Sequence, residues 1–364
     1  IAETDANCAQ SAAFSMAMGE SRENMNVGAI AAAAIAGRVT APNAVITLTQ
    51  GGTVVAATQT DADGSFELTA LRPGQYRVRM ALPEDMLFEQ GAALELTHAD
   101  AQEGQTGEIN LAMGEHVTLD EITAVQTATV GGRAWQDQNA DGVMDAQEPA
   151  LPGVVAALLD ETGAIVAKQT VGEDGRYSFN LIRSGRYSLC FTLPDGELFA
   201  DQSGQEGGSC VAPAEGGTVA TALMTLEGGQ KINSLNVGAI EAGEIGDTVW
   251  LDSNANGLQD YGEPGLKGVE LTLLRVSETG QTDIAAQTVS DEYGYYHFRS
   301  LRPGSYMLRV ELKEGDELTF RFGAPLGEID SDIDPETGMS DVFRLQSGET
   351  RLNIDVGLTE RTKD

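Results

Sequence analysis

Apolar and polar residues alternate along three similar stretches of the chain, and each stretch turns once at a glycine. The three stretches are residues 64–78, 175–189 and 294–308. Successive side chains of a β-strand point to opposite faces of the sheet, so an alternating run has one face that can be buried. Each stretch therefore predicts a β-hairpin. The expected core positions of the first hairpin are Phe66, Leu68, Tyr76 and Val78.

Further repeated segments surround each hairpin. A second alternating run precedes it, at residues 45–48, 154–159 and 269–274. A short marker closes each repeat, because Asn236-Val-Gly-Ala-Ile240 matches Asn26-Val-Gly-Ala-Ile30 and, more loosely, Asp355-Val-Gly-Leu358. Repeats at this spacing indicate tandem domains. We expect residues 1–30 to be the C-terminal tail of a preceding, truncated repeat, followed by domains at residues 31–125, 126–241 and 242–364.

The strand pattern predicts an all-β fold made of tandem β-sandwiches. Short alternating runs recur with glycine-containing turns between them, and no stretch shows a convincing helical period. Such a series of short strands is typical of a sandwich. The connections between the expected domains are short and contain no proline-rich or serine-rich linker. We therefore expect neighbouring domains to be joined semi-rigidly.

Composition and charge narrow the choice of partners. The chain has 364 residues, 41% hydrophobic and 5% aromatic, with 43 glycines, a mixture that suits small β-domains with many turns. The formal net charge of −34 disfavours nucleic acid and anionic membrane surfaces, because phosphate binding needs basic patches. Copies of so acidic a chain repel each other, so we expect a monomer that attracts divalent cations. No apolar run reaches the roughly 18 residues of a membrane span, so we expect no membrane insertion.

Two acidic loops carry the most specific chemistry in the sequence. The first has oxygen-bearing side chains at Asp137, Asn139, Asp141, Asp145 and Glu148, with Val143 at its seventh position. The second has them at Asp252, Asn254, Asn256, Asp260 and Glu263, with Leu258 at its seventh position. An EF-hand calcium loop places oxygen ligands at positions 1, 3, 5, 9 and 12, a glycine at 6 and a backbone carbonyl at 7. We therefore predict that each loop binds one Ca²⁺ through these residues.

The setting of the two loops differs from that of an EF-hand. Asp, Asn and Gly are also common in turns, so a single match could be an Asx-rich turn, but two matches at the same place in two repeats favour calcium. A short β-like run ending at Trp135 or Trp250 precedes each loop, and Glu-Pro follows it. No helix pair is expected that could open and close on calcium. The sequence therefore predicts a structural ion and not a signalling switch.

Other candidate sites are less specific. Asp330, Asp332 and Asp334 could hold a further ion or could form an exposed acidic turn, and the sequence leaves both interpretations open. Cys190 and Cys210 could close a disulfide, which an extracellular setting favours, or remain two thiols. No nucleophile elbow, phosphate-binding glycine loop or Cys-x-x-Cys motif is present. The sequence therefore predicts that the chain is not an enzyme.

The third repeat carries a longer signature around its loop. Trp250 precedes the loop, Glu263-Pro-Gly-Leu-Lys-Gly-Val269 follows it, and a Gly-x-Tyr-x-Phe hairpin comes next. This arrangement resembles the SdrD B-like repeats of serine-aspartate-repeat surface adhesins. The resemblance covers nearly all of residues 245–358 and, less fully, residues 129–240. Residues 31–125 keep only the hairpin, without the acidic loop, and are more similar to a carboxypeptidase-regulatory or collagen-adhesin B-type module.

The resemblance implies a fold and a function. It implies tandem immunoglobulin-like β-sandwiches of the collagen-adhesin B-type, or prealbumin-like, fold. It also implies calcium-stiffened stalk or spacer repeats of an adhesin that is extracellular, on the bacterial cell surface, and anchored to the cell wall in its parent protein. The alternative is an adhesin segment that itself recognises a host protein or glycan. Exposed aromatic side chains would favour this alternative, with Tyr261 and Tyr295 as candidates.

Overall fold

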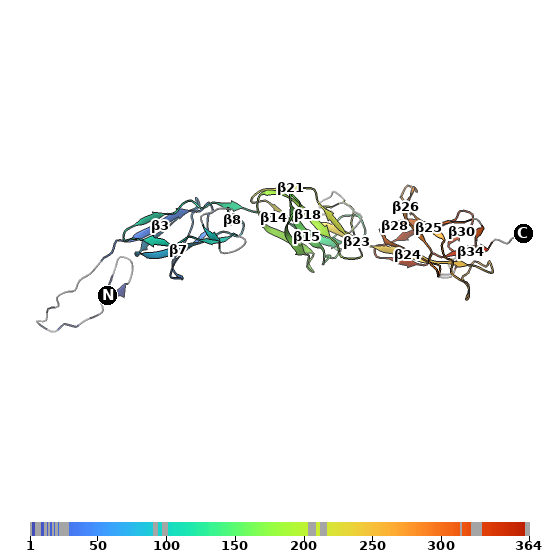
Figure 1. Ribbon diagram of the computed structural model, residues 1–364, viewed down its shortest axis with the longest axis horizontal. Coiled ribbons are helices and arrows are strands. Elements are labelled where there is room, and N and C mark those ends of the chain that lie inside the picture. The colour runs from blue at the N-terminus through green and yellow to red at the C-terminus, as the bar shows by residue number, and fades with distance from the viewer. Residues whose placement is uncertain are drawn as a thin grey trace. The chain divides into compact units, whose positions relative to one another are not determined.

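The computed structural model describes residues 29–89, 94–96, 101–202, 209–211, 217–313, 315–321 and 330–360, together with scattered residues before residue 29. The prediction for residues 1–30 lies almost wholly outside these residues, where only the ladder of β1 (Ala2–Glu3) with β2 (Ala9–Gln10) is defined. Cys8 also lies outside them. The described residues form strands and turns without any helix (Figure 1). The all-β prediction is confirmed.

The first sandwich occupies residues 33–126. Its larger sheet has the strand order β5-β4-β7-β10-β9, with β11 beside β7, and its smaller sheets have the orders β12-β3-β6 and β13-β8. The strands are β3 (Ala33–Arg38), β4 (Val45–Gln50), β5 (Thr53–Gln59), β6 (Ser65–Leu71), β7 (Gly74–Ala81), β8 (Met86–Phe88), β9 (Glu95–Leu96), β10 (Glu103–Gln105), β11 (Ile109–Leu111), β12 (His116–Thr118) and β13 (Ala124–Gln126).

The second sandwich occupies residues 128–241 and has two facing sheets. Their strand orders are β17-β14-β23-β19, with β22 beside β14, and β16-β15-β18-β20, with β21 beside β18. The strands are β14 (Ala128–Gln136), β15 (Val155–Asp160), β16 (Ile165–Thr170), β17 (Arg176–Ile182), β18 (Gly185–Thr192), β19 (Glu197–Phe199), β20 (Thr218–Ala220), β21 (Met224–Leu226), β22 (Lys231–Ile232) and β23 (Val237–Glu241).

The third sandwich occupies residues 243–360 and repeats this arrangement. Its strand orders are β27-β24-β34-β29, with β33 beside β24, and β26-β25-β28-β31-β30, with β32 beside β28. The strands are β24 (Gly243–Leu251), β25 (Glu270–Val276), β26 (Thr282–Val289), β27 (Tyr295–Leu301), β28 (Gly304–Glu311), β29 (Asp316–Leu318), β30 (Ile333–Asp334), β31 (Met339–Ser340), β32 (Phe343–Leu345), β33 (Thr350–Leu352) and β34 (Val356–Glu360).

The hairpin segments of the sequence form consecutive strands that lie in opposite sheets of each sandwich. In the first sandwich β6 pairs with β3 while β7 pairs with β4, so the segment crosses from one sheet to the other. The alternation nevertheless predicts the core correctly. Its four expected positions are all buried, at 6% exposure or less: Phe66, Leu68, Tyr76 and Val78. The expectation that each segment is one antiparallel hairpin is therefore wrong, because the two halves bury their apolar faces against each other across the core.

A tryptophan and a glycine explain the repeated Val-Gly marker. Trp135 and Trp250 are fully buried, and each lies opposite the marker glycine of the neighbouring parallel strand. A Cβ at Gly238 would stand 2.6 Å from the Trp135 ring, and one at Gly357 would stand 2.8 Å from the Trp250 ring. Real Cβ atoms do not come so close, so the marker must keep a glycine wherever the tryptophan is present. The first sandwich has Thr40 at the place of the tryptophan.

Cys190 and Cys210 are free thiols, so the favoured disulfide is wrong. Cys190 lies on β18, where Cys190 pairs with Ala157 and Ala220 in the sheet of β15 and β20. Cys210 instead donates its backbone N–H to Asn236 O at 2.7 Å, beside the other sheet. The two cysteines therefore belong to opposite sheets. The sequence separation of the cysteines gave no sign of this difference.

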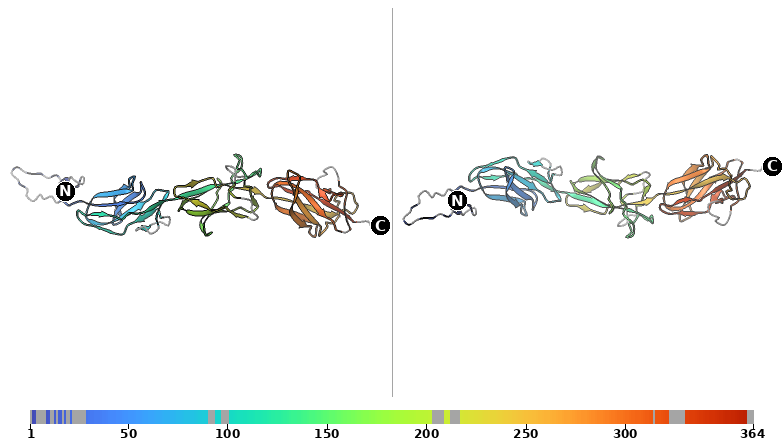
Figure 2. Two further views of the ribbon diagram at one scale, coloured as in Figure 1. Left: turned by 90° about the horizontal axis from the view of Figure 1, so that it is seen from above. Right: turned by 90° about the horizontal axis from the view of Figure 1, so that it is seen from below.

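The chain divides into two compact units. One comprises residues 1–129 with the segments 179–185 and 225–231, and the other comprises residues 130–178, 186–224 and 232–364. Figure 2 shows the strands of each sandwich in facing layers.

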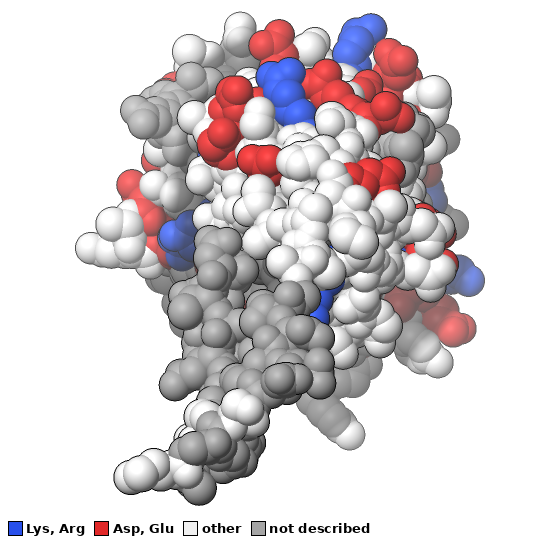
Figure 3. Space-filling view, turned by 90° about the vertical axis from the view of Figure 1, so that its left-hand side faces the viewer, with Lys and Arg blue, Asp and Glu red and all other residues white. Residues whose placement is uncertain are grey.

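Acidic side chains line the upper edge of the face drawn in Figure 3, and uncharged side chains fill its middle. In the part of the chain that is described, no helix is long and apolar enough to cross a membrane.

Candidate functional site

Each acidic loop begins directly after the long first strand of its sandwich. β14 ends at Gln136, and Asp137 follows it. The backbone N–H of Asp137 donates to Ala239 O at 2.6 Å, on the neighbouring strand β23. In the third sandwich the N–H of Asp252 donates in the same way to Leu358 O at 2.8 Å. Both loops are thus attached to the closing strand of their own sandwich.

In the first loop two buried carboxylates hold the two ends of the turn. Asp137 is 0% exposed, and its Oδ2 accepts a hydrogen bond from Gly142 N at 2.8 Å. Glu148 is 7% exposed, and its two oxygens accept from Gln138 N and Asp145 N, both at 2.9 Å. Glu148 therefore reaches back across the whole loop. The first and last predicted ligands are brought together by the local fold.

The middle residues of the first loop converge on the same interior. Asn139 Nδ2 donates to Asp141 Oδ2 and to Asp145 Oδ2, both at 3.1 Å. Asp141 Oδ1 accepts from Val143 N at 2.8 Å, which fixes the backbone at the seventh position. The side chains at positions 3, 5 and 9 of this loop are therefore neighbours. The structure brings together all five predicted side-chain ligands.

The second loop repeats these contacts atom for atom at its ends. Asp252 is 2% exposed, and its Oδ2 accepts from Gly257 N at 2.7 Å. Glu263 Oε1 accepts from Ser253 N at 2.8 Å, and Glu263 Oε2 accepts from Asp260 N at 2.9 Å. Two loops with different sequences in between thus adopt one hydrogen-bond pattern. Such agreement points to a shared requirement for the positions of these oxygens.

The middle of the second loop is also equivalent to that of the first. Asn254 Nδ2 and Asn256 Nδ2 donate to Asp260 Oδ2, at 2.8 and 2.9 Å. Asn256 Oδ1 accepts from Leu258 N at 2.8 Å. This loop has amides at positions 3 and 5, where the first loop has one amide and one carboxylate. The second loop consequently carries one negative charge less than the first.

The glycine at position 6 of each loop is required by the backbone. Gly142 has φ 75° and Gly257 has φ 79°, in the left-handed region that other residues adopt with strain. At this point the chain reverses, and the N–H of each glycine points at the first carboxylate of its loop. This agrees with the sharp turn that an EF-hand loop needs at its sixth position.

The first carboxylates of the two loops differ in their electrostatics. Burial raises the pKa of Asp137, and the bond from Gly142 offsets only part of that effect. Burial also acts to raise the pKa of Asp252, but hydrogen bonds from Thr319 and Gly257 outweigh it, so this pKa is lowered. The hydroxyl of Thr319 donates to Asp252 Oδ2. The second sandwich has Ala200 at the equivalent place, which follows β19 as Thr319 follows β29.

The first sandwich has no acidic loop after its first strand. Thr40 Oγ1 donates to Ala124 O at 3.0 Å and accepts from Ala124 N at 2.7 Å. The chain then runs from Thr40 to the next strand at Val45 without any acidic residue. The absence of the motif there agrees with the sequence analysis. That the first sandwich binds no calcium stays a prediction.

A second group of carboxylates lies in the third sandwich, next to the second loop. Leu258 of that loop forms a β-bridge with Asp330. Asp332 Oδ2 accepts from Asp355 N at 2.8 Å, and Asp355 Oδ1 accepts from Thr248 N at 3.4 Å. Asp355 is 1% exposed, and its Oδ2 is buried with no hydrogen-bond partner among the described residues. A buried carboxylate oxygen of this kind is costly unless a cation or a proton satisfies it.

The composition of this group differs from the sequence expectation. Asp334 caps a turn, where its Oδ1 accepts from Glu336 N at 2.8 Å. Burial raises the pKa of Asp332 to about 6, and that of Asp355 to about 8, and the negative charges of neighbouring carboxylates add to both shifts. Asp247 is one of these neighbours. Sequence reasoning missed Asp247 and Asp355, because Asp247 lies on β24 and Asp355 lies just before β34, within the marker segment.

The second sandwich lacks this group at its equivalent positions. Cys210 N donates to Asn236 O as Asp332 N donates to Asp355 O, so Cys210 and Asn236 occupy the places of the two aspartates. Arg133 N donates to Asn236 Oδ1, the bond that Thr248 N makes to Asp355. The third sandwich is therefore the more acidic one at this place. The difference provides an internal comparison between two similar sandwiches.

The donor set of the two loops fits calcium. Every predicted side-chain ligand offers a carboxylate or amide oxygen, the hard donors that Ca²⁺ prefers, and neither loop contains histidine or cysteine. Within the described residues, no three His, Cys, Asp or Glu side chains are already arranged as metal ligands. The loop carboxylates are held by backbone N–H groups and asparagine amides instead.

Comparison with known proteins places the chain in a family. The SdrD B-like domain family matches residues 128–239 and 243–358, which together are more than half of the chain. The chain belongs to the SdrD B-like family. The carboxypeptidase regulatory-like domain family matches residues 34–114, in the first sandwich. Both resemblances expected from the sequence are confirmed, and the two SdrD B-like matches are the two segments with acidic loops.

The curated relatives are serine-aspartate repeat-containing proteins. The chain is 30% identical over 290 residues to "Serine-aspartate repeat-containing protein D" of Staphylococcus aureus strain MW2, covering 78% of the chain and 20% of that protein. It is 28% identical over 279 residues to "Serine-aspartate repeat-containing protein F" of Staphylococcus epidermidis, covering 73% of the chain and 15% of that protein. The SdrD B-like chain thus spans a fifth or less of the length of these relatives.

Solved structures that the chain resembles include a pilin subunit. The major pilin subunit BcpA of Bacillus cereus matches with a TM-score of 0.31 and 13% identity, over 90% of the chain and 99% of the pilin. The Bacillus anthracis TIE protein matches with a TM-score of 0.28 and 17% identity, over 91% of the chain and 50% of that protein. Scores this low support no inference about function.

Proposed function

We propose that this SdrD B-like segment is a spacer of a bacterial cell-surface adhesin, in which one Ca²⁺ stiffens each of two sandwiches. The observation that carries the proposal is the matching geometry of the loops at residues 137–148 and 252–263. In both loops the first carboxylate is buried, and the last one accepts hydrogen bonds from two backbone N–H groups of its own loop. The named relatives are serine-aspartate repeat-containing proteins. The surface location and the wall anchoring of the parent protein come from the family resemblance.

Electrostatics explains why an ion would stiffen such a loop. The first loop gathers Asp137, Asp141, Asp145 and Glu148, four carboxylates that repel each other when ionised. A divalent cation among them replaces this repulsion by attraction and ties the two ends of the loop together. Because Asp137 is bonded to β23, the ion would also secure the end of the sandwich. The folded, calcium-bound state is stabilised by mass action.

Titration calorimetry on the full chain tests the binding. We expect Ca²⁺ to bind at both loops, and Glu148→Gln and Glu263→Gln each to remove one binding event. Glu173, an exposed glutamate outside the loops, provides the control through Glu173→Gln. Mg²⁺ should compete poorly, because it demands near-ideal octahedral geometry. Calcium binding that is absent, or a number of bound ions that both loop substitutions together leave unchanged, would contradict the proposal.

The carboxylate group of the third sandwich extends the proposal. The partnerless Oδ2 of Asp355 supports a further cation there, with Asp332 and Asp330 as neighbours. The second sandwich, with Cys210 and Asn236 at these places, would bind one ion fewer. Asp355→Asn should therefore lower the number of calcium ions bound by the full chain by one. An unchanged number of bound ions would contradict the further cation at Asp355 but not the proposed calcium binding at the two loops.

The alternative function, recognition of a host protein or glycan, has one observation in its favour. Tyr261, Tyr293 and Tyr295 of the third sandwich are exposed, and tyrosine is common in protein and sugar contacts. Tyr293 and Tyr295 flank the turn that opens β27, while Tyr261 lies in the second loop. Replacing all three by alanine should abolish binding of the chain to host cells if this function holds. Unchanged binding, or none by the parent chain, would leave only the spacer function.

A further inference from the structure

A single residue connects one sandwich to the next. Thr127 stands between β13 and β14, and its N–H and Oγ1 donate to Asp85 O at 2.9 and 2.8 Å. Ala242 stands between β23 and β24, and its N–H donates to Gly196 O at 2.9 Å. Both connectors are therefore hydrogen-bonded to the sandwich that precedes them. Linkers this short leave few backbone torsions about which a junction can bend.

An arginine of the third sandwich reaches across the second of these junctions. Arg302 lies in the turn between β27 and β28. Its Nη1 donates to Phe199 O at 2.8 Å, and its Nη2 donates to Asp201 Oδ1 at 2.9 Å. The side chain of Arg302 is only 25% exposed. Phe199 ends β19 and is itself buried, so its carbonyl is a fixed acceptor.

The first junction contains the same contact. Arg183 lies in the turn between β17 and β18, at the place that Arg302 occupies in the third sandwich. Its Nη2 donates to Phe88 O at 2.8 Å, and Phe88 is the buried last residue of β8. Each acceptor thus ends the corresponding strand of the preceding sandwich. The same donor and acceptor positions are used at two junctions whose surrounding sequences differ.

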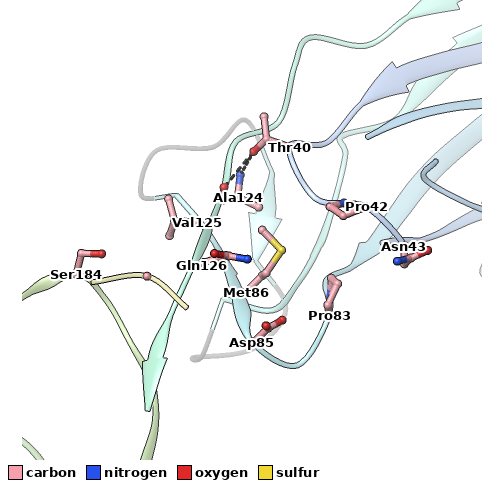
Figure 4. Close-up of a pocket in the computed structure, with 11 residues that line it drawn as sticks. Thr40, Pro42, Asn43, Pro83, Asp85, Met86, Ala124, Val125, Gln126 and Ser184 are labelled. Atoms are coloured by element: carbon pink, nitrogen blue, oxygen red, sulfur yellow. Dashed lines mark hydrogen bonds between the residues drawn. The ribbon is translucent and has the colours of Figure 1, made fainter. Parts of the chain in front are cut away.

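A groove beside the first of these contacts shows what holds the junction. The groove has a volume of about 610 Å³, and its lining includes Ser184, next to Arg183, and Gln126, next to the connector. Figure 4 shows Ser184 on one side of this space and Met86, Asp85 and Gln126 on the other. The two sides are not packed together there. Directed hydrogen bonds, and not continuous apolar burial, therefore join them at this point.

A backbone contact completes each junction from another side. Gly348 N donates to Glu241 O at 3.0 Å, and Gly229 N donates to Thr127 O at 3.0 Å. Both glycines have positive φ, at 68° and 80°. A Cβ at Gly348 would stand 2.3 Å from Glu241 Oε2. The following sandwich thus contacts the preceding residues at each junction through an arginine and through a glycine turn.

We propose that Arg183 and Arg302 are junction clasps, each of which locks its own sandwich onto the last-strand carbonyl of the sandwich before it. This inference deepens the proposed spacer function, because it names a second source of stiffness that does not need an ion. A guanidinium is always charged and carries several N–H donors in one plane. It can therefore donate to a buried carbonyl and to a neighbouring carboxylate at the same time. The partner that each clasp fits is the exit end of another repeat of this chain.

The clasps and the calcium loops make separable contributions. At the second junction the acceptor Phe199 pairs with Ala239, and the carbonyl of Ala239 accepts from Asp137 of the first loop. Calcium should therefore tighten the second junction as well as the loop. At the first junction the acceptor, Phe88, belongs to the first sandwich, which has no acidic loop. We expect its clasp to work equally well in calcium and in EDTA.

Hydrogen exchange with mass spectrometry on the full chain tests the clasps. Arg302→Ala should speed exchange of the peptide containing Ala242 about tenfold, since a hydrogen bond from a charged donor is worth at least that factor. Arg183→Ala should do the same for the peptide containing Thr127. Arg299→Ala and Arg176→Ala change exposed arginines of the same hairpin segments and should leave both junctions unchanged. Exchange in β25 and β15 reports whether each sandwich stays folded.

Two further variants test the same proposal. Arg302→Lys keeps the charge but loses the planar set of N–H donors, so it should give a smaller increase even if the alanine variant misfolds. Asp201→Asn should have little effect, because Asp201 is 59% exposed and such ion pairs contribute little. Junction exchange that is unchanged in both Arg302 variants would overturn the clasp. Calcium insensitivity of the loops with loosened junctions in these variants would instead overturn only the calcium function.

Discussion

Thr319 donates a hydrogen bond to the buried carboxylate of Asp252, whereas the second sandwich has Ala200 at this place and no described hydroxyl donates to Asp137. This hydroxyl is one difference between two loops that share the contacts at their ends. It lowers the pKa of Asp252 against the opposing effect of burial, whereas burial prevails at Asp137. The two acidic loops should therefore respond differently to acid.

Removing this hydroxyl should make the second loop resemble the first. Thr319→Ala leaves Asp252 without one donor, so its pKa should rise, and unfolding of the third sandwich in EDTA should become easier by about 1 kcal/mol. Carboxyl-carbon NMR titration and urea unfolding measure the two effects. Ala200→Thr is the reciprocal variant and should lower the pKa of Asp137. A pKa of Asp252 that does not move in Thr319→Ala would show that the hydroxyl has no such role.

The marker glycine should be intolerant of any side chain. Gly238→Ala places a methyl group against the Trp135 ring, in a site with no room for it. Overpacking of this kind costs about 1–3 kcal/mol, and we expect a loss in that range in urea unfolding of the second sandwich. Gly217→Ala is the matched control, because a Cβ there meets nothing within 4 Å. Equal stability of the two variants would contradict the proposed close contact.

The carboxylates of the third sandwich predict a pH dependence with a definite sign. The pKa of Asp355 is raised to about 8 and that of Asp332 to about 6, mainly by burial. Between about pH 4 and pH 8 the folded state keeps protons that the unfolded state has released, so the free energy of unfolding falls as pH rises. The contribution is fully present at low pH and is lost as pH rises through these pKa values. Thermal unfolding in EDTA should show this loss.

Asp355→Asn is the variant that tests this pH dependence. It copies the second sandwich, where Asn236 occupies the same place, so the fold should tolerate it. We expect the melting temperature of the third sandwich to change less between pH 5 and pH 8 in this variant than in the parent chain. A slope that is the same in both would exclude Asp355 as the titrating group.

The two described cysteines should behave as shielded thiols. Burial raises the pKa of both, to about 12 for Cys210, so little reactive thiolate exists at neutral pH. We expect slow alkylation of both in the folded chain, slower at Cys210, and rapid alkylation in urea. Peptide mass spectrometry identifies each site and separates them from Cys8. A peptide that joins Cys190 to Cys210 without prior oxidation would contradict the free-thiol structure.

The alternating pattern predicted the core more reliably than it predicted the pairing. Phe66, Leu68, Tyr76 and Val78 are buried as expected, because alternation depends only on which face of a strand is apolar. Whether two strands pair or cross to opposite sheets depends on contacts with segments far away in the sequence. For the same reason nothing in the sequence separated Cys190 from Cys210.

The loops were predictable because their ligand spacing is local. Twelve consecutive residues fix the positions of Asp137 and Glu148, so the motif alone indicated their meeting. The group around Asp355 was only partly foreseen, since Asp247 and Asp355 are brought to Asp332 by three different parts of the fold. The junction arginines gave no signal at all. Arg183 and Arg302 look like ordinary turn residues until the preceding repeat is placed beside them.

The central claim, that calcium stiffens two of the three sandwiches, is tested most directly by hydrogen exchange of the full chain with and without calcium. In millimolar Ca²⁺, exchange of peptides covering residues 137–148 and 252–263 should slow by at least about tenfold relative to EDTA, because the ion closes both loops. Peptides covering residues 39–60 of the first sandwich should exchange equally in both conditions. Slower exchange in all three sandwiches, or in none, would contradict the account.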